Sequence, residues 1–509
     1  MNTKQLRQKI LDLAIRGKLV PQDPNDEPAS VLLERVRAEK EKLIKEGKIK
    51  RDKNGSMSSR GDDKSHYENV PFDIPNSWRW VKLGDIAEKI GSGSTPRGGR
   101  AVYQSYGVVF IRSQNVYNGG LYLDDVAYIT DEINEQMAGT QVQPNDILLN
   151  ITGASIGRSA IVPSDLGKAN VNQHVSIIRL DERQFQPFVH KVLISDYIQS
   201  IIKNVQVGAA QEGLPAEKQK EMLIPLPPLA EQHRILTAIE SSFAFIDEIE
   251  QNKFDLQAAV TATKSKILSL AIRGKFIPQD PNDEPASVLL DRIRAEREKL
   301  IKAGKIKRDK SDSAIVMSDD NSYYGKIPFV VPETWQWYRL SECWDLLSGR
   351  DLTPSEYSAE PIGIPYITGA SNFIDDELII NRWTEYPKVV AKNGDLLITC
   401  KGTVGVMRIN TQGEVHIARQ IMAIRNRSGL NTKFLQIVMA SFILQITSAA
   451  KGIIPGISRE DLLDMVIPCP PIEEQSRIVT AVDESQSILN EIAENLNSGF
   501  RLFRQIEHR

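Results

Sequence analysis

The side chains that most often perform catalysis or bind metals are few in this sequence and are not spaced to act together. Zinc sites draw cysteine and histidine ligands from short, regular spacings, and neither residue type shows them here. We therefore expect no metal site and no disulfide framework in this chain. The three cysteines are Cys343, Cys400 and Cys469, and the six histidines are His66, His174, His190, His233, His416 and His508.

Motifs for nucleotide and methyl-transfer chemistry are also missing from the sequence. No Gly-rich loop ends in Gly-Lys-Ser or Gly-Lys-Thr, the loop that cradles nucleotide phosphates. No Asn-Pro-Pro-aromatic or Asp-Pro-Pro-aromatic tetrapeptide, which an amino-methyltransferase would carry, occurs either. Asp146 and Asp395 each precede an apolar run, and we interpret them as turn residues rather than catalytic carboxylates. The sequence thus predicts a chain that is not itself an enzyme.

Length and composition are those of an ordinary globular protein. The 509 residues are 41% hydrophobic and 25% charged, with a net charge of -3, and the length suggests roughly three folded units. The scarcity of cysteine fits the reducing cytoplasm. Residues 434–450 are uncharged but contain two glutamines, so we expect a buried helix rather than a membrane span. A net charge near zero excludes a uniformly basic surface but permits local basic patches.

The sequence repeats itself, and such a repeat determines the architecture. Residues 9–53 and 266–310 align at an offset of 257 without a gap, and 38 of the 45 positions are identical. At the same offset, PFDIPNSWRW at residue 71 matches PFVVPETWQW at residue 328. A second match, at an offset of 243, pairs PPLAEQHRI at residue 227 with PPIEEQSRI at residue 470.

A long helix is predicted after each Pro-Pro pair. Residues 230–273 contain no Gly or Pro, and eight of eleven positions taken at alternating spacings of four and three are apolar. This pattern is typical of a coiled-coil seam of about five heptads. The C-terminal region repeats the seam from Ile478 to Ile506. Laid end to end, the C-terminal and N-terminal segments reconstruct the central segment about once, which predicts a circularly arranged duplication whose termini meet.

Two regions of domain size, residues 71–228 and 328–471, lie between the helical segments. They align weakly but in order; for example, DILL at residue 146 matches DLLI at residue 395, and Arg179 matches Arg425. Each region ends in a helix-like stretch, residues 188–205 and 434–450. Framework residues are shared while loop side chains differ, so we expect two related domains that present different surfaces.

These features together resemble the specificity subunits of type I restriction–modification systems. The resemblance rests on the PPLAEQ and PPIEEQ helix starts, the twice-used LAIRGK…PQDPNDEPASVLL segment and the Pro-x-x-Trp-x-Trp starts of the two domains, and it covers essentially the whole chain. It implies that each domain reads one half of a bipartite double-stranded DNA target. It also implies an antiparallel helical spacer, two docked methyltransferase subunits and added restriction subunits. S-adenosylmethionine, ATP and magnesium would then bind to the partner subunits.

The expected fold is therefore α+β: two mixed α/β target-recognition domains joined by long antiparallel coiled-coil helices in a pseudo-two-fold, circularly arranged duplication. The predicted limits are an N-terminal helical repeat (1–53), a linker (54–70), the first domain (71–228), a central helical spacer with a repeat arm (229–310), a second linker (311–327), the second domain (328–471) and a C-terminal spacer helix (472–509).

Residues that read DNA are expected among the polar side chains of the loops that differ between the domains. Base edges are contacted chiefly by Arg, Lys, Asn and Gln, while phosphate contacts only position the protein. Any one candidate is explained equally well by a solvated loop, but as a set we favour recognition. The candidates are Arg97, Arg100, Arg112, Gln114, Asn115, Asn172 and Gln173 in the first domain, and Arg350, Thr368, Ser371, Asn372, Lys401, Arg419 and Gln420 in the second.

The charged arms at the C-terminal ends of the two repeat copies can be interpreted in two ways. Residues 34–53 carry nine basic against five acidic side chains, and residues 291–310 nine against four. We interpret them as solvated or partner-facing surfaces, although the KIKRDK ends could touch phosphates. Two other functions stay open: a specificity partner of a fused, type II-like nuclease–methyltransferase, and a coiled-coil adaptor that binds only proteins.

Overall fold

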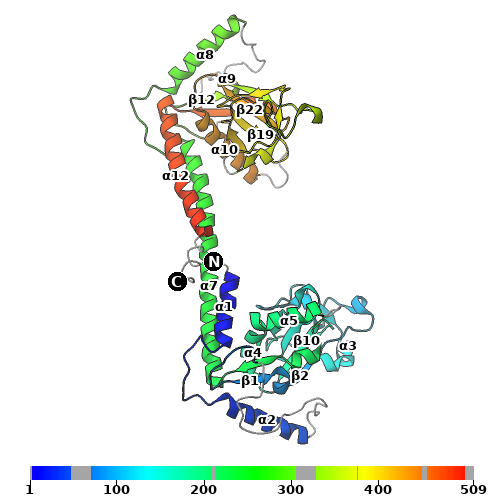
Figure 1. The fold of residues 1–509 in the computed structure, drawn as a ribbon. Helices are drawn as coiled ribbons and strands as arrows, with labels where there is room; N and C mark the ends of the chain where they lie inside the picture. Colours follow the sequence, from blue (N-terminus) through cyan, green and yellow to red (C-terminus); the bar gives the residue numbers. More distant parts are fainter. Residues whose placement is uncertain are drawn as a thin grey trace. The chain divides into compact units, whose positions relative to one another are not determined.

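The computed structural model describes residues 3–46, 70–208, 213–304, 328–374, 377–449 and 456–498, and it forms two compact units. Unit 1 comprises residues 1–252 with 500–509, and unit 2 comprises residues 253–499. The boundary lies inside the longest helix, α7 (Leu229–Ala271), so each unit contains one part of it (Figure 1). Both predicted linkers and both KIKRDK ends lie outside the described residues, apart from Val70.

Each unit combines scaffold helices with one mixed domain. Unit 1 contains α1 (Thr3–Ile15), α2 (Ala29–Lys45), α3 (Asp131–Gln136), α4 (Gln186–Leu193), α5 (Asp196–Gly208), α6 (Ala216–Lys220) and the first part of α7. Unit 2 contains the rest of α7 with α8 (Ala286–Lys302), α9 (Leu340–Cys343), α10 (Thr432–Ala449), α11 (Arg459–Leu463) and α12 (Ile472–Ser498).

The scaffold of unit 1 is an antiparallel pair of helices, α1 against the first part of α7 (Figure 1). Arg7 near the start of α1 pairs with Asp247 at 2.6 Å, while Asp26, beyond the end of α1, pairs with Arg234 at 2.6 Å. Between these ion pairs, apolar side chains of both helices are buried in one core: Leu11, Ala14, Ile15, Ile235, Ile239 and Ile246.

Unit 2 repeats this arrangement with equivalent residues. The second part of α7 runs antiparallel to α12, since Lys264 donates to Asn490 at 2.5 Å and Gln257 to Asn497 at 2.9 Å. The buried residues Leu268, Ala271 and Ile272 lie 257 positions after Leu11, Ala14 and Ile15, and they share a core with Ile478 and Val482 on α12. The predicted duplication and antiparallel helices are thus confirmed.

The predicted seam of α7 is buried only towards its two ends. Ile235, Ile239, Ile246 and Val260 are buried, but the central seam residues Ile249 and Leu256 are each 44% exposed. They lie near the last contacts described for α1 and α12, so no described helix covers them. The seam positions Gly499, Phe503 and Ile506 lie outside the described residues, as do the chain ends that were predicted to meet.

The domain of unit 1 contains two main sheets. Their strand orders are β2-β10-β7-β8 and β6-β3-β9, with β3 and β9 parallel. Two smaller pairs, β1 with β11 and β4 with β5, complete the domain. The strands are β1 (Arg79–Lys82), β2 (Ala87–Ser92), β3 (Val108–Ile111), β4 (Val116–Tyr117), β5 (Gly120–Leu121), β6 (Ala127–Ile129), β7 (Ile147–Asn150), β8 (Ser159–Ile161), β9 (Ala169–Val171), β10 (Val175–Leu180) and β11 (Leu223–Leu226).

The domain of unit 2 has the same plan with other side chains. Its sheets have the orders β13-β22-β19-β20 and β17-β14-β21-β18, with the pairs β12-β23 and β15-β16. The strands are β12 (Gln336–Arg339), β13 (Trp344–Ser348), β14 (Ile364–Ile367), β15 (Phe373–Ile374), β16 (Glu377–Leu378), β17 (Trp383–Thr384), β18 (Val390–Ala391), β19 (Leu396–Thr399), β20 (Met407–Ile409), β21 (Val415–Ile417), β22 (Ile421–Asn426) and β23 (Val466–Cys469).

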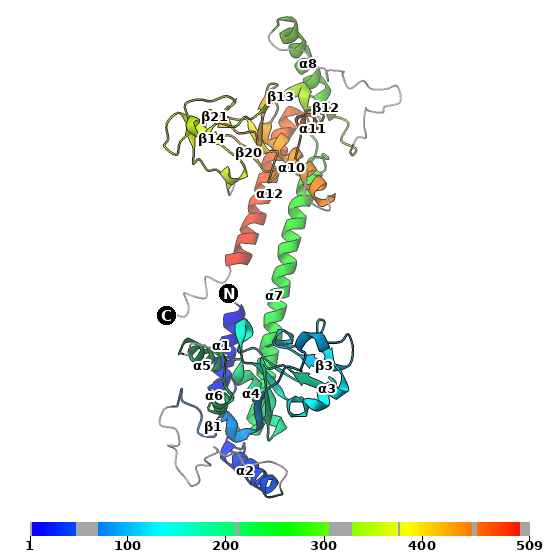
Figure 2. The ribbon, with the colours of Figure 1, turned by 90° about the vertical axis from the view of Figure 1, so that its right-hand side faces the viewer.

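Alternate side chains of one central strand link each sheet to two cores, as the two-residue period of a strand requires. On β7, Ile147 and Leu149 pack in the core shared with the scaffold helices, and Leu148 packs in the core between the sheets. On β19, Leu396 and Ile398 face the scaffold core and Leu397 the other one. In Figure 2, β14 and β21 accordingly lie farther from α12 than β13 does.

The two predicted helix-like stretches differ. The stretch that begins at residue 434 lies in the single helix α10 as far as Ala449, and residue 450 lies outside the described residues; residues 188–205 instead span two helices, α4 and α5. Gln8 of α1 stabilises the break, because its side chain donates to the Ile194 carbonyl at 3.2 Å and accepts from the Asp196 amide at 3.0 Å. The equivalent of Gln8 in unit 2 is Ser265. Within the described chain, no helix is long and apolar enough to cross a membrane.

Candidate nucleic-acid interface

All seven candidate residues of the first domain lie in loops at one edge of its sheets, which we call loop edge 1 (residues 93–102, 112–122, 151–158 and 172–174). The parallel strands β3 and β9 end there together, with Ile111 opposite Val171. The strands β2 and β7 also end there, beside the start of β10. Backbone hydrogen bonds join the loops, for example from the Asn172 amide to the Ile111 carbonyl at 3.1 Å.

The seven candidates of the second domain converge in the same way on loop edge 2 (residues 349–354, 368–374, 400–405 and 418–420). Strands β14 and β21 are parallel and end with Ile367 opposite Ile417. Strands β13 and β19 end beside the start of β22. The topology therefore brings residues from four separate loops to one edge of each domain, as an interface with a long partner requires.

Exposure divides the candidates into two groups. Arg112 and Thr368 are half-buried, and Asn115, Asn172 and Asn372 are buried. The exposed side chains, which are available to a partner, are Arg97, Arg100, Gln114 and Gln173 on loop edge 1 and Arg350, Ser371, Lys401, Arg419 and Gln420 on loop edge 2.

Two of the buried asparagines hold the chain rather than face solvent. Asn115 accepts from the Arg112 amide at 3.0 Å and donates to the Tyr122 carbonyl at 2.9 Å. Asn372 does the same, accepting from the Thr368 amide at 2.9 Å and donating to the Ile379 carbonyl at 2.8 Å. These amides close equivalent hairpins, a role that the choice of polar residue types did not distinguish from base contact. Whether any of the fourteen residues contacts bases stays a prediction.

A chain of polar side chains joins three loops of loop edge 1. The Thr95 hydroxyl contacts the Gln173 amide oxygen, and the Gln173 amide nitrogen lies 3.0 Å from Nε2 of His174. Nδ1 of His174 lies 2.6 Å from the Thr152 hydroxyl. On loop edge 2, Arg419 instead pairs with Asp351 at 2.8 Å. Equivalent strands thus carry different polar networks at the two edges.

Exposed aromatic residues are the part of loop edge 1 that the sequence interpretation missed. Tyr117 and Tyr122 flank the turn of the β4–β5 hairpin, and their rings meet edge to face with centroids 4.7 Å apart. The Arg158 guanidinium lies over the Tyr117 ring, 4.5 Å from its centroid. The sequence does contain a pattern that indicates this hairpin, because the run YNGGLY places two tyrosines around an Asn-Gly-Gly turn.

Asp146 and Asp395 are structural residues, which confirms their interpretation as turn residues. Asp146 accepts from the Gln143 amide at 2.7 Å and pairs with Arg179 at 2.7 Å. Asp395 accepts from the Lys392 amide at 2.7 Å and pairs with Arg425 at 2.8 Å. Each carboxylate joins a turn to the neighbouring strand, and its charge is balanced by an arginine.

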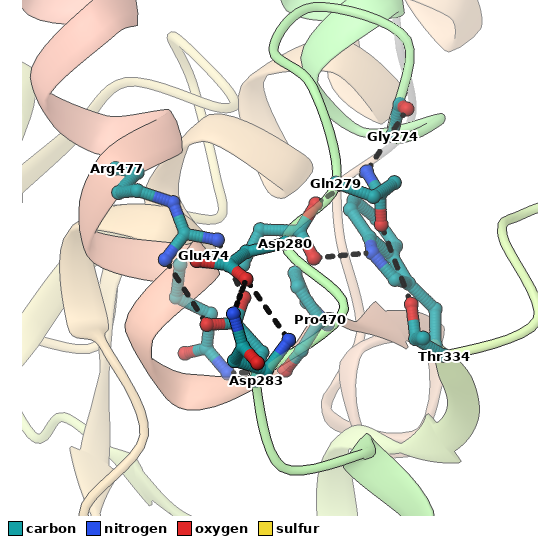
Figure 3. Close-up of polar contacts among 11 residues, drawn as sticks. Gly274, Gln279, Asp280, Asp283, Thr334, Pro470, Glu474 and Arg477 are labelled. Atoms are coloured by element: carbon teal, nitrogen blue, oxygen red, sulfur yellow. Dashed lines mark hydrogen bonds and ion pairs between the residues drawn. The ribbon is translucent and has the colours of Figure 1, made fainter.

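A buried polar junction attaches each domain to its scaffold helix. In junction 2 (Gln279, Asp283, Trp335, Glu474 and Arg477), Glu474 accepts from the Trp335 indole at 2.9 Å. Glu474 also accepts from Gln279 at 2.6 Å (Figure 3). Arg477, one helical turn later, forms two bonds to Asp283, at 3.1 and 2.5 Å. The junction thus connects the repeat loop, the residue directly before the first strand of the domain and the first turn of α12.

Junction 1 (Gln22, Asp26, Trp78, Glu231 and Arg234) repeats these contacts. Glu231 accepts from Trp78 at 2.9 Å and from Gln22 at 2.5 Å, and Arg234 pairs with Asp26. A glycine is required beside each tryptophan: Gly17 and Gly274 have φ of 67° and 64°, and an added Cβ would lie 2.4 Å from Cγ of a proline in either copy.

Burial changes the ionisation of several groups. It raises the pKa of Glu231 and of Glu474, although the indole and amide donors act in the opposite direction. The free cysteines are buried, and burial raises the pKa of Cys343 to about 12 and of Cys400 to about 11. Such thiols are poor nucleophiles. Among the described residues, no three His, Cys, Asp or Glu side chains gather closely enough to hold a metal ion.

Comparisons with known proteins agree with this geometry. Residues 75–256 and 332–498 match the family described as type I restriction modification DNA specificity domain. The type I restriction enzyme EcoAI specificity subunit of Escherichia coli is 28% identical over 562 aligned positions, covering 96% of this chain and 90% of that protein. The EcoEI specificity subunit of Escherichia coli is also 28% identical, covering 97% of this chain and 91% of that protein.

The fold is also shared with a solved structure. The HsdS subunit from Thermoanaerobacter tengcongensis has a TM-score of 0.55 and 22% sequence identity, covering 87% of this chain and 98% of that chain. The matched family segments hold the strands of the two domains and much of the long helices. Since these segments make up more than half of its length, the chain belongs to the type I restriction–modification DNA specificity family.

Proposed function

We propose that this chain is the DNA-recognition subunit of a type I restriction–modification complex, in which loop edge 1 and loop edge 2 each read one half of a bipartite target. The observation that carries the proposal is the convergence of all fourteen candidate residues on equivalent edges of two domains. The frameworks of these domains agree and their edge side chains differ, which suits two unlike half-sites on one DNA duplex. The helical scaffold sets the distance between the half-sites.

The partners follow from the duplication. A methyltransferase subunit docks on each copy of the repeated segment, and restriction subunits complete the complex. This is supported by the near-identity of the repeats, because 38 of 45 matched residues agree while the domains between them diverge. S-adenosylmethionine, ATP and magnesium are bound by those partners, and this chain contributes no catalytic group. The complex acts in the cytoplasm, where free thiols stay reduced.

An exchange of one domain tests the proposal. Residues 71–228 are replaced by the corresponding domain of another family member, and the complex is expressed with its partner subunits. Methylation mapped across a host genome should show a new sequence in one half of the target and the original sequence in the other. A reciprocal exchange of residues 328–471 serves as the matched control and should change the opposite half. An unchanged target after both exchanges would contradict the proposal.

A further inference from the structure

We propose that the hairpins β4–β5 and β15–β16 each present a pair of exposed side chains that contact double-stranded DNA and contribute to half-site specificity. The pair is Tyr117 with Tyr122 in the first domain and Ile374 with Ile379 in the second. The inference rests on the proposed function, because it adds contacts to loop edge 1 and to loop edge 2, which contains Ile374 and continues into β16. The proposed contacts are hydrophobic and aromatic, whereas the candidates chosen from the sequence were all polar.

The two hairpins are equivalent in position and in the way they are held. Both pairs are related by the offset of 257 that relates the repeats. In each hairpin the amide of a buried asparagine donates to the backbone carbonyl of the second exposed residue, Tyr122 at 2.9 Å and Ile379 at 2.8 Å. The backbone amides of these residues donate in return to the same asparagines, at 2.9 and 2.8 Å. The backbone support is therefore shared.

The residues that face outward from this shared support differ completely. Tyr117 and Tyr122 are 38% and 59% exposed, and Ile374 and Ile379 are 47% and 41% exposed. Single exposed apolar side chains are ordinary on protein surfaces, so exposure alone carries no argument. Their position supports the proposal, because large exposed side chains occur at the same two places in both domains. In each domain they follow the strand, β3 or β14, after which recognition candidates lie.

The first hairpin is tied to a neighbouring strand and contacts a cationic side chain. Asn118 at its turn accepts from the Ser159 amide at 3.0 Å, which ties the turn to β8. The Arg158 guanidinium carbon lies over the Tyr117 ring, 4.5 Å from its centroid, which is within the range of a cation–π contact. Arg158 is partly exposed, and a guanidinium carries N–H donors from which a phosphate or a guanine edge can accept. The order of hairpin and arginine before binding limits the entropy lost on binding.

The two pairs suit different base contacts. Tyrosine offers an aromatic face for deoxyribose and bases and a hydroxyl that donates or accepts a hydrogen bond. Isoleucine offers only apolar contact, for which the thymine methyl group is the matching feature of the major groove. Exchanging the pairs should therefore change base preference at one position or a few adjacent positions, without altering the framework that presents them.

The test exchanges the pairs in the full complex with its partner subunits. The variant Tyr117→Ile/Tyr122→Ile should lose or change base preference in the half-site read by the first domain, with about tenfold weaker binding to the original sequence. The variant Ile374→Tyr/Ile379→Tyr should do the same in the other half-site. Binding is measured on a library of duplexes randomised in both half-sites, and methylation is mapped in parallel.

A matched control and the intact half-site separate specificity from misfolding. Tyr106→Ile removes a tyrosine that is 77% exposed but precedes β3, at the opposite end of that strand from the hairpin, and should change nothing. An unaltered preference in the untouched half-site shows that each exchange variant has folded. Equal weakening on all sequences, or exchange variants that behave like the control, would overturn the inference. Failure of the domain exchange of residues 71–228 would instead overturn the proposed function itself.

Discussion

At the scale of single residues, Glu231 and Glu474 are buried carboxyl groups with equivalent hydrogen-bond donors in the two units. Each is 1% exposed, lies in the first turn of a scaffold helix and accepts from one indole and one carboxamide. A buried carboxylate is costly unless its oxygens are hydrogen-bonded. The tryptophan of the domain and the glutamine of the repeat loop therefore stabilise the charge, and together they fix where the domain sits on its own helix.

Removing one donor should destabilise a unit measurably. Trp335→Phe leaves Oε2 of Glu474 without its indole partner in a buried place, and we expect a loss of about 1–3 kcal/mol in the free energy of unfolding. Trp78→Phe should cost a similar amount in unit 1. Trp80→Phe is the control, since its indole nitrogen has no hydrogen bond within the described chain. Hydrogen exchange resolved by segment measures both units; equal effects from all three variants would contradict the role of the junctions.

The same carboxyl groups predict a pH dependence of stability. Burial raises their pKa in the folded chain above the usual value of 4.5, so the folded state holds these protons more tightly than the unfolded state. Their contribution to stability is then greatest at low pH and falls as the pH rises through the folded pKa. The double variant Glu231→Gln/Glu474→Gln has no carboxyl groups at these positions, so it should not show this decrease in stability as the pH rises.

Urea unfolding at two pH values tests the sign of this effect. From about pH 4 to about pH 7, the stability of the wild type should fall relative to that of the double variant, because only the wild type must ionise two buried carboxyl groups. The variant need not be the more stable protein at either pH, since it also alters two hydrogen-bond patterns. The prediction would be contradicted if the difference in the free energy of unfolding between the wild type and the double variant stayed constant. It would also be contradicted if the wild type became the relatively more stable protein as the pH rises.

At the scale of elements, α7 is the feature that both units share. Its 43 residues contain no Gly or Pro, and at about 1.5 Å per residue such a helix extends about 65 Å. It pairs with α1 in unit 1 and with α12 in unit 2, both times antiparallel. A helix of this kind is suited to act as a spacer, because its length changes in fixed steps with the number of residues.

Shortening the spacer should shorten the DNA gap between half-sites. Deleting one heptad from α7 (residues 251–257) and one from α12 (residues 491–497) removes about 10 Å of helix, which corresponds to roughly three base pairs. The preferred gap, read from genome-wide methylation, should decrease by about that amount while both half-site sequences stay the same. An unchanged gap in a complex that still methylates would show that the helices do not set the spacing.

At the scale of the whole molecule, the duplication extends to exposed residues as well as to the cores. Helices α2 and α8 are equivalent in sequence, and their exposed positions include Val31 and Val288. A solvated surface needs only polar residues at such places, whereas a surface that binds the same partner twice must keep the same residues. The scaffold thus presents two similar surfaces and the domains present two different ones.

This reasoning predicts stepwise loss of a partner. Val31→Asp should leave the complex with one methyltransferase subunit, Val288→Asp likewise, and the double variant with none, because a buried charge in an interface is costly. Native mass spectrometry of the assembled complex counts the subunits. Val330→Asp is the control, since this exposed valine corresponds to Asp73 in the first copy. If both subunits stay bound to the double variant, α2 and α8 are not the docking surfaces.

The sequence by itself determined the architecture, because a repeat at a constant offset makes equivalent residues fold alike. The repeats alone show that Leu11 is equivalent to Leu268 and that Glu231 is equivalent to Glu474. The loops that contain the fourteen candidates also follow from the sequence. Strand order then brings those loops together, since parallel strands such as β3 and β9 end at the same edge of a sheet.

Only the tertiary structure decided which side chains of those loops are exposed. Asn115 and Gln114 are neighbours of similar chemistry, but Asn115 turns inward to close a hairpin and Gln114 stays exposed. It also decided that α4 and α5 are separate, through Gln8 of a distant helix, and that the centre of the α7 seam is exposed. An amide can satisfy a base or a backbone carbonyl equally well, and the choice depends on which groups the fold brings within hydrogen-bonding distance.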